Sequence, residues 1–203
     1  MRTLAIETAG TACSIALLDG DDIVAERHEV VGRGHAERLI PWIAELPGGG
    51  HADRIVVGCG PGSFTGVRIG IAAARGLGLG WNVPVTGVSS LALVAAQCDA
   101  DEFIVAVEGG HGELLVQQYR RSPLSAVSDF ASLTAESAAK TMRADVVIGV
   151  GAEQLTAARG YGQAILAEAR AAHITRLPPA FISLPSQPLY GRLPDAKPMI
   201  AEQ

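Results

Sequence analysis

The first third of the chain alternates short apolar runs with turns rich in glycine, alanine and aspartate. Residues 3–8, 12–19 and 23–31 each form such a run. Successive apolar runs joined by short turns predict an antiparallel meander of three strands. A further apolar run at 54–58 is short and contains no polar alternation after its first residue. This pattern predicts a central, parallel strand of the same sheet.

Two segments have the apolar spacing of helices. Residues 35–46 place apolar side chains three and four positions apart, which predicts an amphipathic helix. Residues 67–81 predict a second helix that follows a glycine-rich turn, with Ser63 and Thr65 as caps. This second helix is apolar on nearly every side, so one of its faces is expected to meet a partner. The alternative, a helix buried entirely within its own domain, stays open.

The second half of the chain repeats the order of elements in shortened form. After a strand at 84–88 and a short helix ending at Ala96, the pattern predicts a strand pair, a helix, a strand and a helix at 103–107, 113–119, 134–142, 146–150 and 152–158. The order predicts an α/β fold with mixed sheets flanked by helices. We place the boundary between an N-terminal domain, 1–98, and a smaller C-terminal domain, 99–203.

Prolines concentrate near the end of the sequence. Six of the eleven lie within residues 178–198. Because proline lacks a backbone donor, this segment is not expected to form regular helix or sheet. It is expected to be an extended arm that packs on the body or on a neighbour, with disorder as the alternative.

Composition and charge limit the partners that the chain can bind directly. Hydrophobic residues make up 48% of the 203 residues, enough for a substantial core, and the net charge is −5. Basic residues are scattered, so the chain alone is expected to bind nucleic acid weakly. The three cysteines form no CxxC pair, and no apolar stretch is long enough to span a bilayer. We therefore expect buried thiols, no membrane association and a cytoplasmic location.

The glycine-rich turn 60–66 matches none of the established catalytic or phosphate-binding motifs. Pro61 occupies a position where a nucleophile elbow requires glycine, and neither lysine lies near a glycine loop. No two histidines have the spacing that places both on one helix face, so we expect no metal site and no catalytic residues. The turn at Glu7, Thr8, Gly10 and Thr11 is similar to a phosphate-binding loop and is the candidate nucleotide site.

Several segments of the sequence resemble a known protein family. VGCGPGSFTGVRIGIAAARGLGLG looks like the signature segment of the TsaB family, also called YeaZ. The opening LAIETAGTACSIALLDGDDIVAERHEVVGRGHAERLIP, the segment VPVTGVSSLALVA and the late PLYGRLPDAKP are also similar to that family. Where the related enzyme TsaD has a His-x-x-x-His metal pair, the matching residues here are His35 and Leu39. Glu7 stands where the superfamily usually has an aspartate.

The resemblance implies a two-lobed actin-like ATPase (ASKHA) fold with a reduced second lobe. It implies a non-catalytic scaffold that binds TsaD, joined by TsaE, for N6-threonylcarbamoylation of tRNA adenosine, with tRNA reached only through the complex. It implies a homodimer in isolation and no required cofactor, with weak binding of ATP or ADP and magnesium at the complex interface. The alternative is an ATP-dependent phosphotransferase or a peptidase-like enzyme of the same superfamily. The partner or dimer interface is expected at His35, Ala36, Leu39, Ile43, Val67, Gly70, Ile71 and Ala74, on the paired helices.

Overall fold

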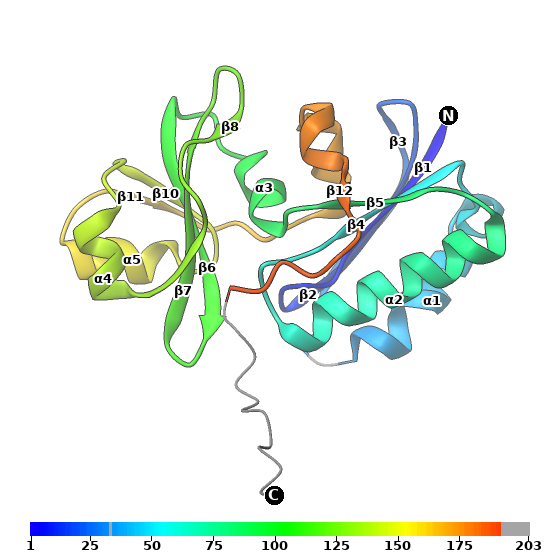
Figure 1. Cartoon of the computed structure of the whole chain (residues 1–203), viewed down its shortest axis with the longest axis horizontal. Helices are drawn as coiled ribbons and strands as arrows, with labels where there is room; N and C mark the ends of the chain where they lie inside the picture. The colour runs from blue at the N-terminus through cyan, green and yellow to red at the C-terminus, as the bar shows by residue number, and fades with distance from the viewer. Residues whose placement is uncertain (33, 192–203) are drawn as a thin grey trace, which may run out of the picture.

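The computed structural model describes residues 1–32 and 34–191, which form two lobes side by side (Figure 1). Each lobe is built on a mixed β-sheet with helices packed against it. The first lobe contains β1 (Arg2–Glu7), β2 (Ala12–Asp19), β3 (Asp22–Val30), α1 (His35–Glu45), β4 (Arg54–Gly58), α2 (Phe64–Trp81), β5 (Val85–Val88) and α3 (Ser90–Ala95). A short 3₁₀ turn, η1 (Pro47–Gly50), joins α1 to β4.

The first sheet has its strands in the order β12-β5-β4-β1-β2-β3. Strands β1, β2 and β3 form the predicted antiparallel meander, and β4 lies parallel to β1 as predicted. Side chains alternate along β1: Leu4 and Ile6 pack with α1 and α2, whereas Ala5 packs on the opposite face. Both faces of the central strands are therefore covered, which explains why these strands lack polar alternation.

The second lobe repeats this arrangement on a smaller scale. It contains β6 (Glu102–Gly110), β7 (Glu113–Arg120), β8 (Ser125–Ala126), β9 (Ala131–Thr134), α4 (Ala135–Thr141), β10 (Val146–Ile148), α5 (Ala152–Arg159) and β11 (Gln163–Ile165). Strand β6 pairs antiparallel with β7 and parallel with β10, as β1 pairs with β2 and β4. The predicted shortened repetition is confirmed by this topology.

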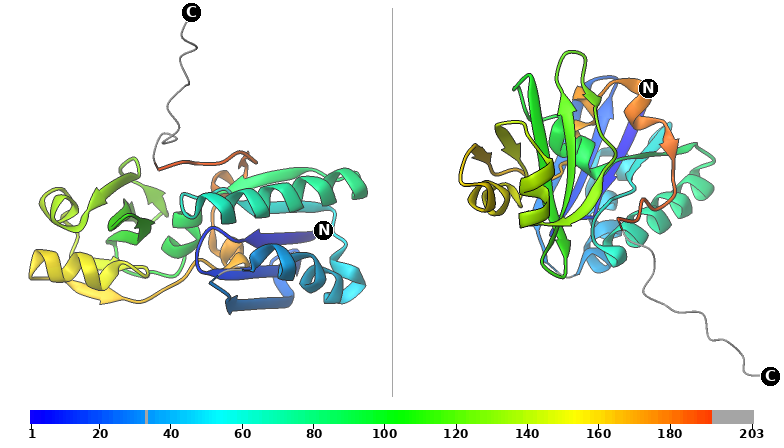
Figure 2. Two further views of the ribbon diagram at one scale, coloured as in Figure 1. Left: turned by 90° about the horizontal axis from the view of Figure 1, so that it is seen from below. Right: turned by 60° about the vertical axis from the view of Figure 1, so that its left-hand side comes forward.

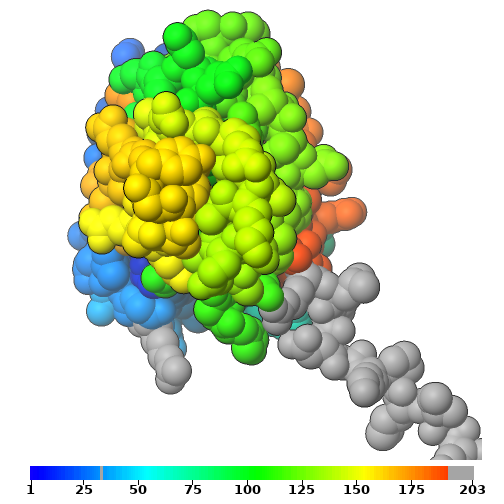
Figure 3. Space-filling model, turned by 90° about the vertical axis from the view of Figure 1, so that its left-hand side faces the viewer, coloured from blue at the N-terminus to red at the C-terminus, as the bar shows by residue number. Residues whose placement is uncertain are grey.

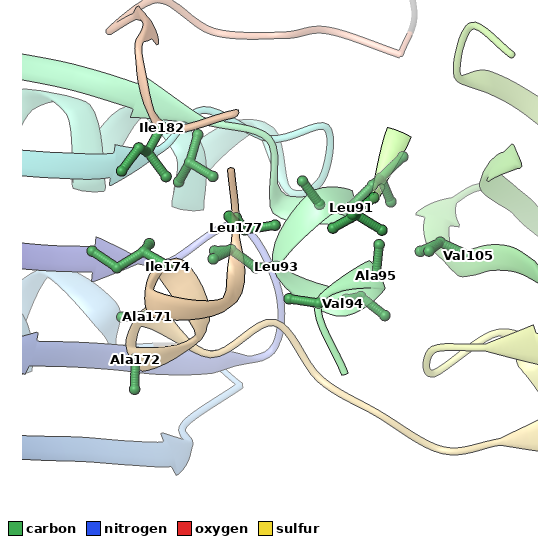
Figure 4. Close-up of a cluster of buried hydrophobic side chains, with 14 of the residues drawn as sticks. Leu91, Leu93, Val94, Ala95, Val105, Ala171, Ala172, Ile174, Leu177 and Ile182 are labelled. Atoms are coloured by element: carbon green, nitrogen blue, oxygen red, sulfur yellow. The ribbon is translucent and has the colours of Figure 1, made fainter. Parts of the chain in front are cut away.

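One hydrophobic core joins the two lobes. Helix α3 lies between the sheets, and its Leu91 and Leu93 are fully buried (Figure 4). From the second lobe, Phe103 and Val105 of β6 point into the same cluster, while the alternate Ile104 packs with α4 and α5. The lobes therefore meet through packed side chains, and the space between them is open only beyond this core.

The chain returns to the first lobe after β11, which corrects the predicted domain boundary. The 3₁₀ helices η2 (Ala171–Arg176) and η3 (Pro179–Ile182) pack on the first sheet beside α3 (Figures 1 and 4). Strand β12 (Leu184–Pro185) then pairs antiparallel with β5 at the edge of that sheet. A single boundary at residue 98 would assign residues 171–191 to the second lobe. In the structure they do not belong with that lobe.

The proline-rich segment is partly different from the prediction. The expectation that it forms no sheet is wrong at β12, because Pro185 lies at the sheet edge, where a residue without a backbone donor is tolerated. Residues 186–191 do run as an extended arm over the body of the protein, as expected (Figure 2). The rest of the segment, 192–198, lies outside the described residues.

Two smaller predictions are confirmed, the Ser63 cap of α2 and the buried cysteines, whereas the predicted Thr65 cap is not. Helix α2 begins at Phe64, and the Ser63 hydroxyl caps it by accepting from the backbone N–H of Gly66 at 3.3 Å. Thr65 lies inside the helix instead of capping it. The three cysteines are free and buried. Among the described residues, every helix is too short or too polar to cross a membrane.

Candidate functional site

A cleft of about 950 Å³ opens between the lobes beyond their shared core. Its walls come from the β1–β2 turn, the N-terminus of α2, the β6–β7 hairpin and the segment that follows β11. The lining residues include Gly10, Thr11, Pro61, Ser63, Phe64, Ser90, Glu108, His111, Glu168 and Tyr190. Of the four residues predicted as a nucleotide site, Gly10 and Thr11 line this cleft, whereas Glu7 and Thr8 are buried.

Glu7 is turned away from the cleft. Its side chain is 1% exposed at the end of β1. One carboxylate oxygen accepts from the Ser90 hydroxyl at 2.7 Å, and the other accepts from the backbone N–H of Ala9 at 2.5 Å. Burial raises the pKa of this carboxyl group, and the bonds from Ser90 and Ala9 only partly oppose that shift. Glu7 therefore ties the end of β1 to α3 and to the turn.

Thr8 is also buried and serves the packing of α2. Its hydroxyl donates to the carbonyl oxygen of Gly66 at 2.7 Å. A Cβ atom at Gly66 would collide with the Thr8 carbonyl oxygen, and one at Gly70 would lie 2.5 Å from the Thr8 hydroxyl. The glycines at these two positions are needed because the helix backbone approaches the end of β1 so closely. This contact joins residues 58 positions apart.

We expect Thr8→Val to destabilise the fold by about 1–2 kcal/mol, because a buried hydrogen bond is lost while the shape of the side chain is kept. Urea denaturation of the two proteins measures the difference. Thr11→Val is the matched control, because Thr11 is exposed and its hydroxyl makes only a 3.3 Å bond. An equal effect of both substitutions would show that the contact between Thr8 and α2 carries no special weight.

Gly10 and Thr11 are the two predicted residues that do line the cleft. The Thr11 hydroxyl donates to one carboxylate oxygen of Glu168 at 3.3 Å. The other oxygen of Glu168 lies 2.9 Å from His28 Nε2 on β3. Glu168 belongs to the segment that carries the chain back from the second lobe. The turn thus contacts a carboxylate at the position where a phosphate-binding loop would face an anion.

The cleft does not fit a magnesium–nucleotide complex held by these residues alone. The described residues that line it include the carboxylates Glu108 and Glu168 and neither lysine nor arginine. Both oxygens of Glu7 are bonded within the protein, so this residue offers no face to hydrated magnesium. Across the described residues, no three His, Cys, Asp or Glu side chains are arranged to hold a metal ion.

The helix pair α1–α2 presents a different face from the one that the sequence suggested. Seven of the eight predicted interface residues are buried against the first sheet, namely His35, Leu39, Ile43, Val67, Gly70, Ile71 and Ala74. Only Ala36 is exposed. We predicted a partner interface at these positions, but seven of them form the core-facing stripe of each helix and are buried in the isolated chain.

The outward face of the pair includes small and apolar residues beside the exposed Arg68 and Arg75. Ala72, Gly76 and Leu79 are exposed on α2, with Leu79 at 86%, and Ile40 is exposed on α1. Glycines divide into two groups: Gly66, Gly70 and Gly78 are packed tightly against the first lobe, whereas a Cβ at Gly76 or Gly80 would meet nothing within 4 Å. Among residues 1–32 and 34–191, nothing therefore requires glycine at positions 76 and 80.

These outward positions were missed at the level of sequence, although their spacing was visible. Gly76 and Gly80 are four residues apart and so lie on one helix face. The pattern shows five glycines in α2, and only the structure shows which of them pack against β1 or β5. Glu168 and His28 were also missed at the level of sequence. These residues are 140 positions apart, and no local sequence pattern predicts their contact.

Comparisons with known proteins identify the family of the chain. The sequence model of the family described as TsaD, tRNA N6-adenosine threonylcarbamoyltransferase, matches residues 23–177. The Escherichia coli protein named tRNA threonylcarbamoyladenosine biosynthesis protein TsaB is 39% identical over 130 residues, which are 60% of this chain and 56% of that protein. The Haemophilus influenzae protein of the same name is 34% identical over 139 residues.

The chain belongs to the TsaB (YeaZ) family, which is related to TsaD.

Solved structures extend the relationship over most of the fold. YeaZ from Pseudomonas aeruginosa superposes with a TM-score of 0.73 at 29% identity, covering 87% of this chain and 89% of that one. The ethanolamine utilization protein EutJ from Carboxydothermus hydrogenoformans has a TM-score of 0.51 at 12% identity, a likeness of fold alone. The two-lobed ASKHA fold, with mixed sheets flanked by helices, is thereby confirmed for this TsaB-family chain. Its matched part spans little more than half of the curated TsaB relatives.

Proposed function

We propose that this chain is a non-catalytic scaffold subunit that binds TsaD through the outward face of α1 and α2. TsaE joins the assembly, and the product is N6-threonylcarbamoyladenosine in tRNA. The curated relatives carry the name of that biosynthesis, and the family model is that of the transferase itself. In the absence of TsaD, a second copy of the chain takes the same face and gives a homodimer. The compartment of this reaction is the cytoplasm.

The observation that carries the proposal is the pair of exposed glycines on α2. An interior glycine destabilises a helix by roughly 0.5–1 kcal/mol relative to alanine. Gly66, Gly70 and Gly78 are explained by close packing inside the lobe, but Gly76 and Gly80 face open space. Small residues at these positions let the axis of another helix approach closely, in the range of about 8–10 Å. The neighbouring Ala72 and Leu79 extend the same face with apolar surface.

The proposal assigns no catalytic residue and requires no cofactor. The cleft has carboxylates where a polyphosphate would need cations, and Glu7 is engaged inside the protein. We therefore propose that any ATP or ADP with magnesium binds weakly and only where TsaD completes the site. A phosphotransferase would need a base near a bound phosphate, and the residues that line the cleft provide no cation to hold that phosphate.

The net charge of −5 supports an indirect role with respect to tRNA. The arginines near the proposed face, Arg68 and Arg75, are already bonded to the C-terminal arm. Nucleic-acid binding depends on clusters of free cations. The proposal is therefore that tRNA meets the complex and not this subunit by itself.

Light scattering tests the proposal directly. The chain alone is expected to have the mass of a dimer, and an equimolar mixture with TsaD of the same organism is expected to contain the heterocomplex in its place. Addition of tRNA to the isolated chain is expected to leave its mass unchanged at physiological salt. A chain that stays monomeric and ignores TsaD would refute the proposal.

A further inference from the structure

The described C-terminal arm crosses from the first lobe to the mouth of the cleft. We call residues 186–191 the strap. It leaves the sheet edge at β12 and runs along α2 toward the second lobe (Figure 2). Seen from the second lobe, its red atoms lie beside the green surface of that lobe (Figure 3). The strap is thus a third connection between the lobes, in addition to the two peptide segments that cross beside α3.

Two arginines of α2 hold the strap on the first lobe. Arg75 Nη2 donates to the carbonyl oxygen of Ser186 at 2.5 Å. Arg68 Nε donates to the Tyr190 hydroxyl at 3.0 Å, and its guanidinium lies 3.6 Å from the centre of the Phe64 ring. Phe64 and Tyr190 stack with their ring centres 5.3 Å apart. Stacking and cation–π contacts of this kind add to the hydrogen bonds that hold Tyr190 in place.

Between these anchors the strap covers Cys59. The backbone N–H of Leu189 donates to the Cys59 carbonyl oxygen at 2.8 Å. The Cys59 thiol lies 3.6 Å from the Pro185 carbonyl oxygen and is completely buried. Burial raises the pKa of this thiol to about 11. The backbone of Gln187 in the strap also bonds to this thiol, so access to Cys59 reports whether the strap and the preceding β12 are in place.

The far end of the strap contacts the second lobe. A Cβ at Gly191 would lie 2.5 Å from Cδ2 of Leu115 on β7 and 3.9 Å from the Ser132 side chain on β9. Tyr190 and Gly191 both line the cleft. A single short segment thus joins α2 of one lobe to β7 of the other at the edge of the cleft, where Leu115 also belongs to the shared core.

We propose that the strap is a latch that keeps the two lobes closed across the cleft, with Tyr190 held in the Phe64–Arg68 pair and Gly191 seated against Leu115. With the strap in place, the lobes are held by this segment in addition to the shared core. When Tyr190 leaves Arg68, the lobes separate about the α3 core and the cleft opens. The inference concerns the isolated chain and does not depend on binding to TsaD.

Alkylation of Cys59, followed by mass spectrometry of the labelled peptides, measures release of the strap. Tyr190→Ala and Arg68→Ala are expected to raise the rate at Cys59 about tenfold, since each removes a charge-assisted or stacked anchor. The buried thiols Cys13 and Cys98 are internal references and should keep their rates. Arg27→Ala is the matched control, because Arg27 lies on β3 and pairs with Glu45 on α1, away from the contacts that hold the strap.

Separation of the lobes is measured by the distance between spin labels at Glu37→Cys on α1 and Glu153→Cys on α5, with Cys59 replaced by alanine. The intact strap should give one narrow distribution, and Tyr190→Ala a broader one that reaches longer distances. Gly191→Val acts at the other end, leaves both arginines intact, and should also broaden the distribution. A faster reaction at Cys59 with an unchanged distribution would overturn the latch, as would unchanged behaviour in both measurements.

Discussion

Gly76→Arg is expected to weaken binding of the chain to TsaD, and to its own copy, by about 100-fold or more. The substitution places a long charged side chain on the outward face of α2, where a Cβ meets open space in the isolated protein. The fold itself should be intact, because the side chain points into solvent in the monomer. In a helix–helix interface the same side chain would prevent close approach and leave a charge without a partner.

Gly76→Ala distinguishes the effect of Gly76 on helix stability from its effect on the docking of a partner. Alanine removes the helix penalty of glycine, so this variant is expected to unfold about 2–4 °C higher than the parent chain. Its methyl group is small enough that docking should weaken far less than with arginine. If Gly76 is required by the interface and not by the fold, its replacement should stabilise the monomer and weaken the complex.

Isothermal titration against TsaD and thermal unfolding of each variant measure the two effects. Ala157→Arg is the matched control, since it adds the same side chain at an exposed position of α5 in the second lobe. If Gly76→Arg binds TsaD as tightly as Ala157→Arg does, the partner contacts another surface. Leu39 and Ile71 are unsuitable for this test, because charged residues at such buried positions would destabilise the fold itself.

The fold was largely predictable because its strands and helices have clear periods. The meander of β1, β2 and β3 and the repeated order in the second lobe follow from apolar runs and turns alone. The path of the chain after β11 could not be predicted from these patterns, because η2 packs on the first lobe through contacts between residues distant in sequence. Ala171, for instance, donates its backbone N–H to Ser14 on β2, a bond across 157 positions.

The candidate site was less predictable than the fold. Periodicity identifies which helix positions are apolar, but it does not say which of two apolar faces meets the sheet. For α2 the answer depends on Thr8, whose contact with Gly66 and Gly70 fixes the helix against β1. Sequence proximity also suggested that Glu7 shares the environment of Gly10 and Thr11. In the structure the end of β1 turns Glu7 inward and leaves the following turn at the cleft.

Glu7→Gln is expected to change the pH dependence of stability, because burial raises the pKa of Glu7 in the folded protein. Below about pH 4.5, Glu7 is protonated in both the folded and the unfolded protein. Its contribution to the free energy of unfolding is therefore fully present in that range. As the pH rises, the unfolded chain ionises first, and the contribution is lost by about 1.4 kcal/mol per pH unit until the folded carboxyl also ionises. Glutamine has no such loss.

Urea denaturation of the parent and Glu7→Gln proteins from pH 4 to pH 8 measures this difference. The stability of the variant relative to the parent is expected to rise with pH and then to level off. Glu102→Gln controls for removal of a carboxylate, since Glu102 is exposed and pairs with Arg120 at the surface. Parallel curves for Glu7→Gln and its parent would mean that the pKa of Glu7 is not raised on folding, because the Ser90 hydroxyl and the backbone N–H groups of Ala9 and Thr8 stabilise the carboxylate.

The same variant separates a structural role of Glu7 from a role in nucleotide binding. A carboxylate that holds hydrated magnesium must face the nucleotide and carry its charge, and glutamine would abolish that function. A carboxyl group that joins β1 to Ser90 and Ala9 needs only to accept hydrogen bonds, which the amide oxygen can partly replace. Glu7→Gln should therefore bind TsaD as tightly as the parent does. In the superfamily loop that this turn resembles, the acidic position would then serve the packing of α3 in place of a metal ion.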